Sequence, residues 1–156
     1  MASLRGGSMT ELLSWHDEWC IGIDWVDADH HEMAMRINRL SDAVNAALDD
    51  DRDGEAKSLV LRRMDELIKH IRAHFAVEED FLRRIAYPAY EGHCRAHYME
   101  VAELIDLRRA LAGDSADELD LEMLADIKRW FFNHVIAEDR AYADYYRSLP
   151  QDSAPE

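Results

Sequence analysis

Apolar residues recur at steps of three and four positions along four stretches of the chain. This spacing places them on one face of an α-helix, whereas a half-buried strand would alternate apolar and polar residues. No stretch shows that alternation. The pattern therefore predicts four helices, over residues 27–48, 55–86, 90–111 and 117–147.

The segments between these helices are short and contain residues that end helices. An acidic cluster at 49–53 and Gly54 follow the first helix, Tyr87-Pro88 follows the second, and Gly113 follows the third. Short connections force neighbouring helices to run antiparallel. We therefore expect an all-α protein, an up-down-up-down antiparallel four-helix bundle.

The two ends of the chain differ from this pattern. Residues 15–25 are rich in tryptophan and interrupted by Gly22, which predicts an irregular N-terminal arm along the bundle. Residues 1–8 (MASLRGGS) are typical of a vector-derived or disordered leader. We expect the bundle domain to occupy 9–150 and a disordered tail to occupy 151–156.

Length and charge limit the classes of partner. The chain has 156 residues, with 18 Lys plus Arg against 33 Asp plus Glu and a formal net charge of -15. One domain of this size buries a proper core, and its acidic surface disfavours nucleic acid and anionic membranes as partners. No run approaches the roughly 20 apolar residues of a membrane span. The two cysteines, Cys20 and Cys94, form no disulfide framework. We expect a cytoplasmic monomer.

Each predicted helix carries histidine or carboxylate residues on its apolar face. Pairs four residues apart, such as His74 with Glu78 and His93 with His97, project from the same side of a helix. Burying an unpaired carboxylate or a cluster of imidazoles is costly, and a bound cation that accepts their lone pairs removes the cost. The candidate metal ligands are His30, His74, Glu78, His93, His97, His134 and Asp139.

The spacing of His134 and Asp139 is irregular. A separation of five residues leaves two side chains out of line on a regular helix. Either Asp139 reaches sideways to the site, or the helix widens locally into a π-bulge, a feature often found at functional sites.

A simpler interpretation competes for each cluster taken alone. A single histidine such as His30 on an apolar face is more often a hydrogen-bonded core residue than a ligand, and pairs four apart arise by chance in any acidic helical protein. Four clusters, one on each helix, favour a metal site. The other histidines and two acidic neighbours are predicted to lie off the site, with His70 near the ligands or on the surface and the two acids as solvated charges: His16, His31, His70, Glu79 and Glu138.

The quoted clusters resemble the hemerythrin family, and in particular its single-domain bacterial members. The matching stretches are GIDWVDADH (22–30), HFAVEE (74–79), HCRAH (93–97) and WFFNHVIAEDRAY (130–142). The resemblance extends from Trp15 to Tyr146. Two departures are Asp29, where bacterial members commonly have Gln, and an additional tryptophan in the arm.

This resemblance implies a centre of two iron ions. His93, His97 and His134 would bind one iron, and His30 and His74 the other. Glu78 and Asp139 would bridge the two, together with an oxo or hydroxo group. The vacant position on the second iron would bind O2 reversibly as hydroperoxide, for storage, delivery or sensing.

The ligand set also bears on whether the protein is an enzyme. Ferritin-like di-iron proteins use four Glu with two His, whereas two carboxylates stabilise oxidised iron less well and favour reversible binding over catalysis. We therefore predict an O2-binding protein that is not an enzyme. The alternatives are a di-iron enzyme acting on peroxide or nitric oxide, and an interaction module that responds to O2 or iron.

Two aromatic residues are candidates for the O2 pocket. Phe131 lies one helical turn before His134, and Trp130 lies beside it. An aromatic wall near the vacant iron position would exclude water and protons. The competing interpretation is that both residues simply pack in the core.

Overall fold

A computed structural model describes residues 11–50, 54–113 and 121–150 of the chain. The predicted leader at 1–8, the predicted tail at 151–156 and the predicted start of the fourth helix at 117 lie outside the described residues. The elements are the 3-10 helix η1 (Asp17–Trp19), the helices α1 (Asp24–Asp49), α2 (Glu55–Arg84), α3 (Tyr90–Leu111), α4 (Leu121–Phe131) and α5 (Asp139–Ser148), and a π-helix, η3 (Phe132–Glu138), that joins α4 to α5.

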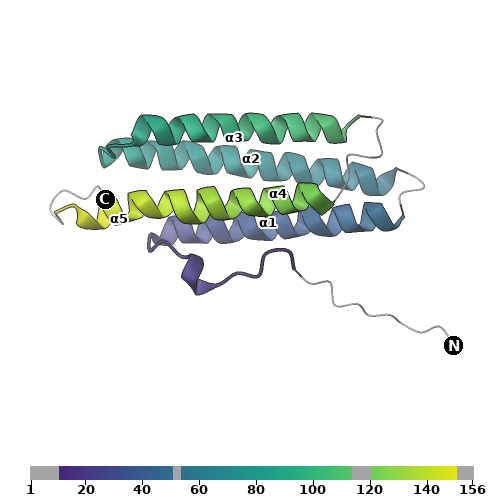
Figure 1. Ribbon diagram of the computed structural model, residues 1–156, viewed down its shortest axis with the longest axis horizontal. Coiled ribbons are helices and arrows are strands. Elements are labelled where there is room, and N and C mark those ends of the chain that lie inside the picture. Colours follow the sequence, from purple (N-terminus) through teal and green to yellow (C-terminus); the bar gives the residue numbers. More distant parts are fainter. Residues whose placement is uncertain (1–10, 51–53, 114–120, 151–156) are drawn as a thin grey trace.

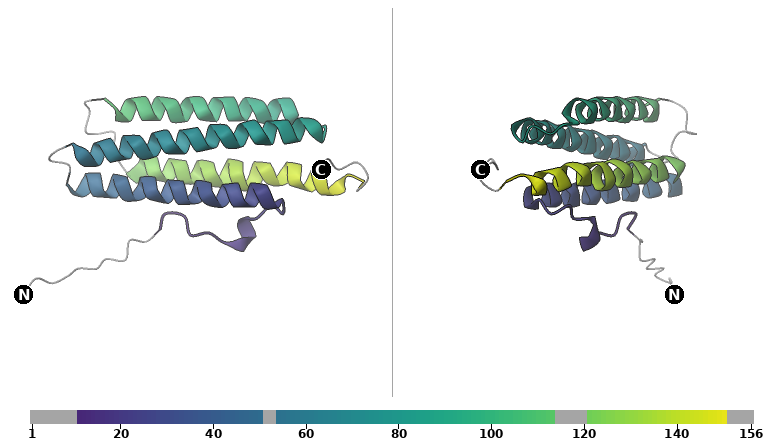
Figure 2. Two further views of the ribbon diagram at one scale, coloured as in Figure 1. Left: turned by 180° about the vertical axis from the view of Figure 1, so that it is seen from behind. Right: turned by 60° about the vertical axis from the view of Figure 1, so that its left-hand side comes forward.

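The helices form the predicted up-down-up-down bundle (Figure 1). Segments α4, η3 and α5 make the fourth long helix, which lies alongside α1 (Figures 1 and 2). Helix α2 packs against both α1 and α3. The described residues contain no strand. None of the described helices is long and apolar enough to cross a membrane.

The helix boundaries follow the predictions, with two corrections that have local causes. Helix α1 begins at Asp24, three residues before the predicted start, because Asp27 accepts hydrogen bonds from the backbone of Ile21 (2.7 Å) and Gly22 (3.0 Å) and holds the incoming chain. Helix α2 ends at Arg84 rather than at residue 86. Ala86 has a left-handed backbone (φ 52°), which stops the helix just before Tyr87-Pro88. Helix α3 has the predicted bounds.

The N-terminal arm is irregular, as expected, except for η1. It is anchored by Leu13, which is buried and exchanges two backbone hydrogen bonds of 2.8 Å with the side-chain amide of Asn38 on α1. Trp25 was predicted to belong to the arm but lies in α1, because the helix begins earlier than expected. The arm therefore follows the bundle as an ordered segment.

Two apolar clusters divide the core along the bundle. The first, which we call the apolar end, lies toward the α1–α2 connection and includes Ile37, Leu40, Val44, Val60, Met64, Leu67, Leu111 and Leu124. The second lies toward the α2–α3 connection and includes Ile21, Val26, Phe81, Leu82 and Tyr142. Between them the same helix faces carry the buried histidines and carboxylates. The sequence order of the antiparallel helices thus places all the candidate ligands at one level, which we call the ligand layer.

Candidate metal centre

The π-helix η3 explains how His134 and Asp139 share one side of the fourth helix. The backbone N–H of Asp139 donates to the carbonyl of His134, five residues earlier, instead of to the residue four earlier. The wider turn takes up the extra residue, so that both side chains point inward, with 1% and 0% exposure. Of the two alternatives left open by the spacing, the π-bulge is therefore confirmed.

The seven predicted ligand residues come together in two buried groups. One contains Glu78, His93, His97 and His134, and the other contains His30, His74, Glu78 and Asp139. Within each group the potential ligand atoms lie within 4.8 Å of one another. Glu78 belongs to both groups. The structure thus assembles every residue of the predicted set, while their role as ligands stays a prediction.

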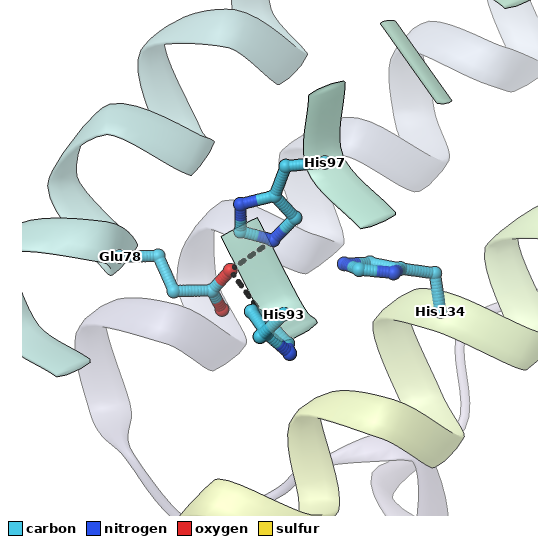
Figure 3. A group of neighbouring side chains, drawn as sticks. All are labelled: Glu78, His93, His97 and His134. Carbon is cyan, nitrogen blue, oxygen red and sulfur yellow. Dashed lines mark hydrogen bonds and ion pairs between the residues drawn. The ribbon is translucent and has the colours of Figure 1, made fainter. Parts of the chain in front are cut away.

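Glu78 reaches toward both groups through its two oxygens. Its Oε2 lies 3.0 Å from His97 Nε2 and 3.3 Å from His93 Nε2, with His134 on the opposite side of the group (Figure 3). Its Oε1 lies 3.7 Å from Nε2 of His74 in the second group. One carboxylate therefore turns an oxygen toward each group, which is the arrangement needed for a bridge between two cations.

Asp139 has the same relation to the two groups from the fourth helix. Its Oδ2 lies 3.2 Å from His30 Nε2, whereas its Oδ1 lies 3.4 Å from His93 Nε2 and 3.6 Å from His134 Nε2. Glu78 and Asp139 thus approach the space between the groups from different helices. Each carboxylate thus has oxygens near histidines of both groups.

The donor atoms fit a pair of bound metal ions. Among the described residues, several buried ring nitrogens and both oxygens of Asp139 have no hydrogen-bond partner: His30 Nδ1 and Nε2, His74 Nε2, His97 Nε2, His134 Nε2, and Asp139 Oδ1 and Oδ2. Buried polar atoms are normally satisfied, so a concentration of unsatisfied ones at a single level needs a ligand. Imidazole nitrogens and carboxylate oxygens together suit iron and other first-row transition metals.

The electrostatics of the groups agree with this fit. Burial, and then the nearby charge of Glu78, raises the pKa of Asp139 well above its usual value. Burial also acts to raise the pKa of Glu78, but hydrogen bonds from His93 and His97 lower it well below the usual value. Burial, and then the charge of His74, lowers the pKa of His30 to about 3. His30 is therefore neutral near pH 7, with a lone pair available to a cation.

Two carboxylates that were predicted to be solvated charges instead contact ligand histidines. Glu79 Oε1 lies 2.9 Å from His97 Nδ1 and accepts a hydrogen bond from it, and Glu138 Oε2 lies 3.2 Å from His134 Nδ1. For Glu79 the prediction is wrong, because its side chain is rotated toward the neighbouring helix α3 rather than toward solvent. Glu138 is 51% exposed, as expected for a solvated charge, but it also contacts a ligand histidine. Glu138 follows His134 by four residues and lies over its outer nitrogen.

Sequence reasoning missed two further carboxylates of this kind. Asp29 Oδ2 lies 2.7 Å from His74 Nδ1, and Glu100 Oε1 lies 2.9 Å from His134 Nδ1. Burial opposes the charge on Asp29, yet the hydrogen bond and charge of His74 lower its pKa. Glu100 could have been found from the sequence, because it follows His97 by three residues on the same helix.

Tyr142 is a third missed residue. Its buried hydroxyl donates a hydrogen bond to Glu78 Oε1. Burial, and then the charge of Glu78, raises the pKa of this phenol, so the hydroxyl keeps its proton. The signal in the sequence was its position three residues after Asp139, on the same helix face.

The remaining histidines lie outside both groups, as predicted. His70 Nε2 lies 3.4 Å from Asp29 Oδ1 and so lies next to a carboxylate that contacts His74. His31 stacks on Trp15 with ring centroids 4.9 Å apart, and His16 packs against Trp19 at 5.3 Å. None of the three faces the ligand layer.

Aromatic rings line the groups on the side of the apolar end. Phe131 is fully buried, and Trp130 lies parallel to the His134 ring with centroids 6.4 Å apart. Phe75, which the sequence did not single out, stacks on His97 at 3.6 Å and meets the edge of His134 at 5.3 Å. Trp19 of the arm packs against Phe131 at 6.1 Å. The role of Phe131 and Trp130 in an O2 pocket stays a prediction.

Comparison with known proteins identifies related sequences and folds. A family model described as "Hemerythrin HHE cation binding domain" matches residues 21–146. A bacteriohemerythrin of Stenotrophomonas maltophilia is 28% identical over 137 residues, covering 88% of this chain and 83% of that protein. A bacteriohemerythrin of Campylobacter jejuni is 30% identical over 128 residues, covering 79% and 86%. A crystal structure of a hemerythrin mutant matches with a TM-score of 0.74 and 22% identity, covering 86% of this chain and 97% of that chain, and shows the likeness of fold.

Proposed function

Because this chain belongs to the hemerythrin family, we propose that it holds two iron ions in the two ligand groups and binds O2 reversibly there. The observation that carries the proposal is the placement of Glu78 and Asp139. Each turns one oxygen toward the three-histidine group and one toward the two-histidine group. Two shared carboxylates suit a pair of metals better than a single ion.

The proposed division of ligands follows the two groups. His93, His97 and His134 would hold one iron, and His30 and His74 the other, with Glu78 and Asp139 shared between them. The first group offers more protein donors than the second, so the second iron keeps a position for O2. When bound, the iron pair supplies the two electrons that O2 binding at such a centre draws on.

Residues around the two groups orient a proposed ligand and exclude water. The Tyr142 hydroxyl fixes the orientation of Glu78 through its hydrogen bond, and fixed ligands lower the cost of arranging the site around a metal. Phe75 is buried against the His97 and His134 rings and excludes water from them, and Phe131 adds a buried apolar ring one helical turn before His134. A dry pocket limits proton access and thereby favours the return of O2 over its reduction.

Storage, delivery and sensing of O2 all use the same centre. The acidic composition disfavours a nucleic-acid partner, and we propose that the protein acts as a monomer in the cytoplasm. O2 binding, rather than catalysis, is the activity that the ligand set favours.

Metal analysis combined with visible spectroscopy tests the proposal. The protein is loaded anaerobically with ferrous iron, the bound iron is quantified, and spectra are recorded before air, after air and after degassing. Two irons per chain are expected, with a visible band that appears in air and disappears on degassing. One metal per chain, or a preference for zinc, would overturn the di-iron proposal. A band that never reverses, with turnover of peroxide or nitric oxide, would favour the enzyme.

A further inference from the structure

Four carboxylates lie on the outer side of the proposed ligand histidines. Each faces an Nδ1 atom while the Nε2 atom of the same ring faces the metal groups. Asp29 contacts His74, Glu79 contacts His97, and Glu100 and Glu138 both contact His134, at distances of 2.7, 2.9, 2.9 and 3.2 Å. None of the four carboxylates is a predicted ligand, but each contacts a histidine that is.

Among the described residues, these carboxylates differ from several exposed acids in pairing with histidines rather than with an arginine. Asp65, Asp80, Asp126 and Asp144 each form an ion pair with an arginine. Within the described part of the chain, no arginine or lysine forms an ion pair with Asp29, Glu79, Glu100 or Glu138, whose ion pairs are with histidines. Their negative charge is therefore directed toward the centre.

Partial burial strengthens the effect of these charges. Glu100 is 15% exposed, Glu79 31% and Asp29 33%, whereas Glu138 is 51% exposed. Charges partly removed from water are screened less by solvent and salt. Asp29 and Glu79 also form hydrogen bonds with the Nδ1 atoms of His74 and His97, and a carboxylate that accepts such a proton increases the electron donation of the ring through Nε2. Both effects stabilise the more positive metal.

The charges are distributed unevenly between the two groups. Three of the four carboxylates contact histidines of the three-histidine group, namely His97 and His134. In the two-histidine group only His74 has such a partner, because the ion pair that His30 forms among the described residues uses its Nε2 atom and not its Nδ1 atom. The iron with more protein ligands therefore has the more negative surroundings.

We propose that Asp29, Glu79, Glu100 and Glu138 are positioning residues that bias the bound iron pair toward its ferric state. This inference rests on the proposed di-iron function and deepens it. In air this bias promotes oxidation of the centre. Two ferrous ions give two electrons to one O2, which takes up two protons and leaves as hydrogen peroxide. The dry pocket opposes this oxidation, so the four charges and the apolar pocket act in opposite directions on the lifetime of bound O2.

Reduction potentials of charge-neutral variants test the inference. The iron-loaded parent is compared with Asp29→Asn, Glu79→Gln and the double variant Glu100→Gln/Glu138→Gln in a spectroelectrochemical titration, where the electrode exchanges one electron per iron. The amides keep the shape of the side chain and a hydrogen-bond acceptor but lose the charge. Each variant should be easier to reduce than the parent. The double variant should change the ferric-to-ferrous ratio by about tenfold, which is 59 mV for one electron.

Two control variants separate charge at the ligands from other causes. Asp80 lies on the same helix as Glu79, but it is exposed and paired with Arg83 and Arg84. Asp80→Asn removes the same charge, and the reduction potential of this variant should equal that of the parent. Glu79→Asp keeps the charge and should stay near the parent. If Glu79→Asp shifts as far as Glu79→Gln, or if Asp80→Asn shifts equally, the inference is overturned.

The same samples distinguish failure of this inference from failure of the proposed function. If the parent does not bind two irons, the proposed di-iron function is overturned by the iron content alone. If the parent and the variants all carry two irons with unchanged potentials, the function stands and the inference is overturned. Iron release to a chelator gives a second readout, and we expect the neutral variants to lose ferric iron faster than the parent.

Discussion

The apolar end and the ligand layer are neighbouring parts of the same four helices, but different groups fill the space between the helices. At the apolar end, Leu40, Met64 and Leu67 are fully buried among other aliphatic side chains. Two to three helical turns away, the same faces bury His74, Glu78 and Asp139. Aliphatic packing is complete without any further component. The ligand layer becomes comparably stable only when a cation or protons satisfy its polar atoms.

The difference separates two tasks within one bundle. The apolar end holds the helices in position, so that the ligand layer is arranged before a metal enters. The ligand layer then adds stability in proportion to how tightly it binds the metal, because the unfolded chain has no such site. Stability and metal content should therefore respond differently to changes in the two regions.

Removal of iron should have the largest effect on stability. A ligand present at 1,000 times its dissociation constant stabilises a fold by about 4 kcal/mol, and the metal-free protein should lose at least that much free energy of unfolding. Chemical denaturation with and without a strong chelator measures the loss. Hydrogen exchange should rise more in the ligand layer than at the apolar end. Equal stability of the two forms would mean that the metal contributes nothing to the fold.

Leu67→Ala should weaken the apolar end without emptying the metal site. Truncating a fully buried leucine costs about 2 to 5 kcal/mol, because the neighbouring side chains fill the cavity only in part, and Leu67 is 0% exposed. The denaturation midpoint should fall while iron per chain stays at the parent value at low temperature. A parallel loss of iron would show that the two regions are not separable.

Glu78→Ala should have the opposite effect to Leu67→Ala, because iron content rather than packing at the apolar end should be lost. It removes a carboxylate that faces both ligand groups and deprives the Tyr142 hydroxyl of its acceptor. We expect iron affinity to fall by more than the about 10- to 100-fold that is typical of losing a residue that only supports a ligand. Iron analysis after dialysis against a chelator measures it. Full iron content in this variant would show that Glu78 does not bridge the metals.

Phe131→Leu should give the smallest effect, on the boundary between the two regions. Phe131 is fully buried and packs against Trp19, so a serine would add a large packing defect, whereas leucine keeps the position apolar. Loss of the flat ring should admit water and shorten the lifetime of the O2-bound form several-fold at equal iron loading. Stopped-flow spectroscopy after mixing with air measures the decay. An unchanged lifetime would remove Phe131 from the proposed pocket.

Helix periodicity predicted most of the fold, because long amphipathic helices are specified by residues close in sequence. The bounds of α3 were predicted without error. The start of α1 was missed by three residues because Asp27 looks like a helix start in the sequence. In the fold it lies one turn inside α1 and holds the backbone of the arm through two hydrogen bonds.

The inward residues of the site were predictable for the same reason, and the outer residues were not. His74 and Glu78 share the apolar face of a single helix, so the phase of that helix is enough to pair them. The contact of Glu79 with His97 depends on how α2 and α3 are rotated against each other. Phe75 stacks on His97 for the same reason. Such contacts between helices leave no periodic signal in either sequence segment.

The π-helix has a consequence for how this chain tolerates changes in length. A π turn is equivalent to one residue added to an α-helix, and here it lies between His134 and Asp139. Deleting one residue from 135–138 would let the helix return to regular α geometry, at the cost of one hydrogen-bond rearrangement. Asp139 would then follow His134 by four residues, a spacing that keeps both side chains on the same face of a regular helix. Loss of one residue here should therefore leave Asp139 and Tyr142 directed at the site, whereas insertion of a further residue would turn both by about 100° relative to His134, so this segment tolerates shortening better than lengthening.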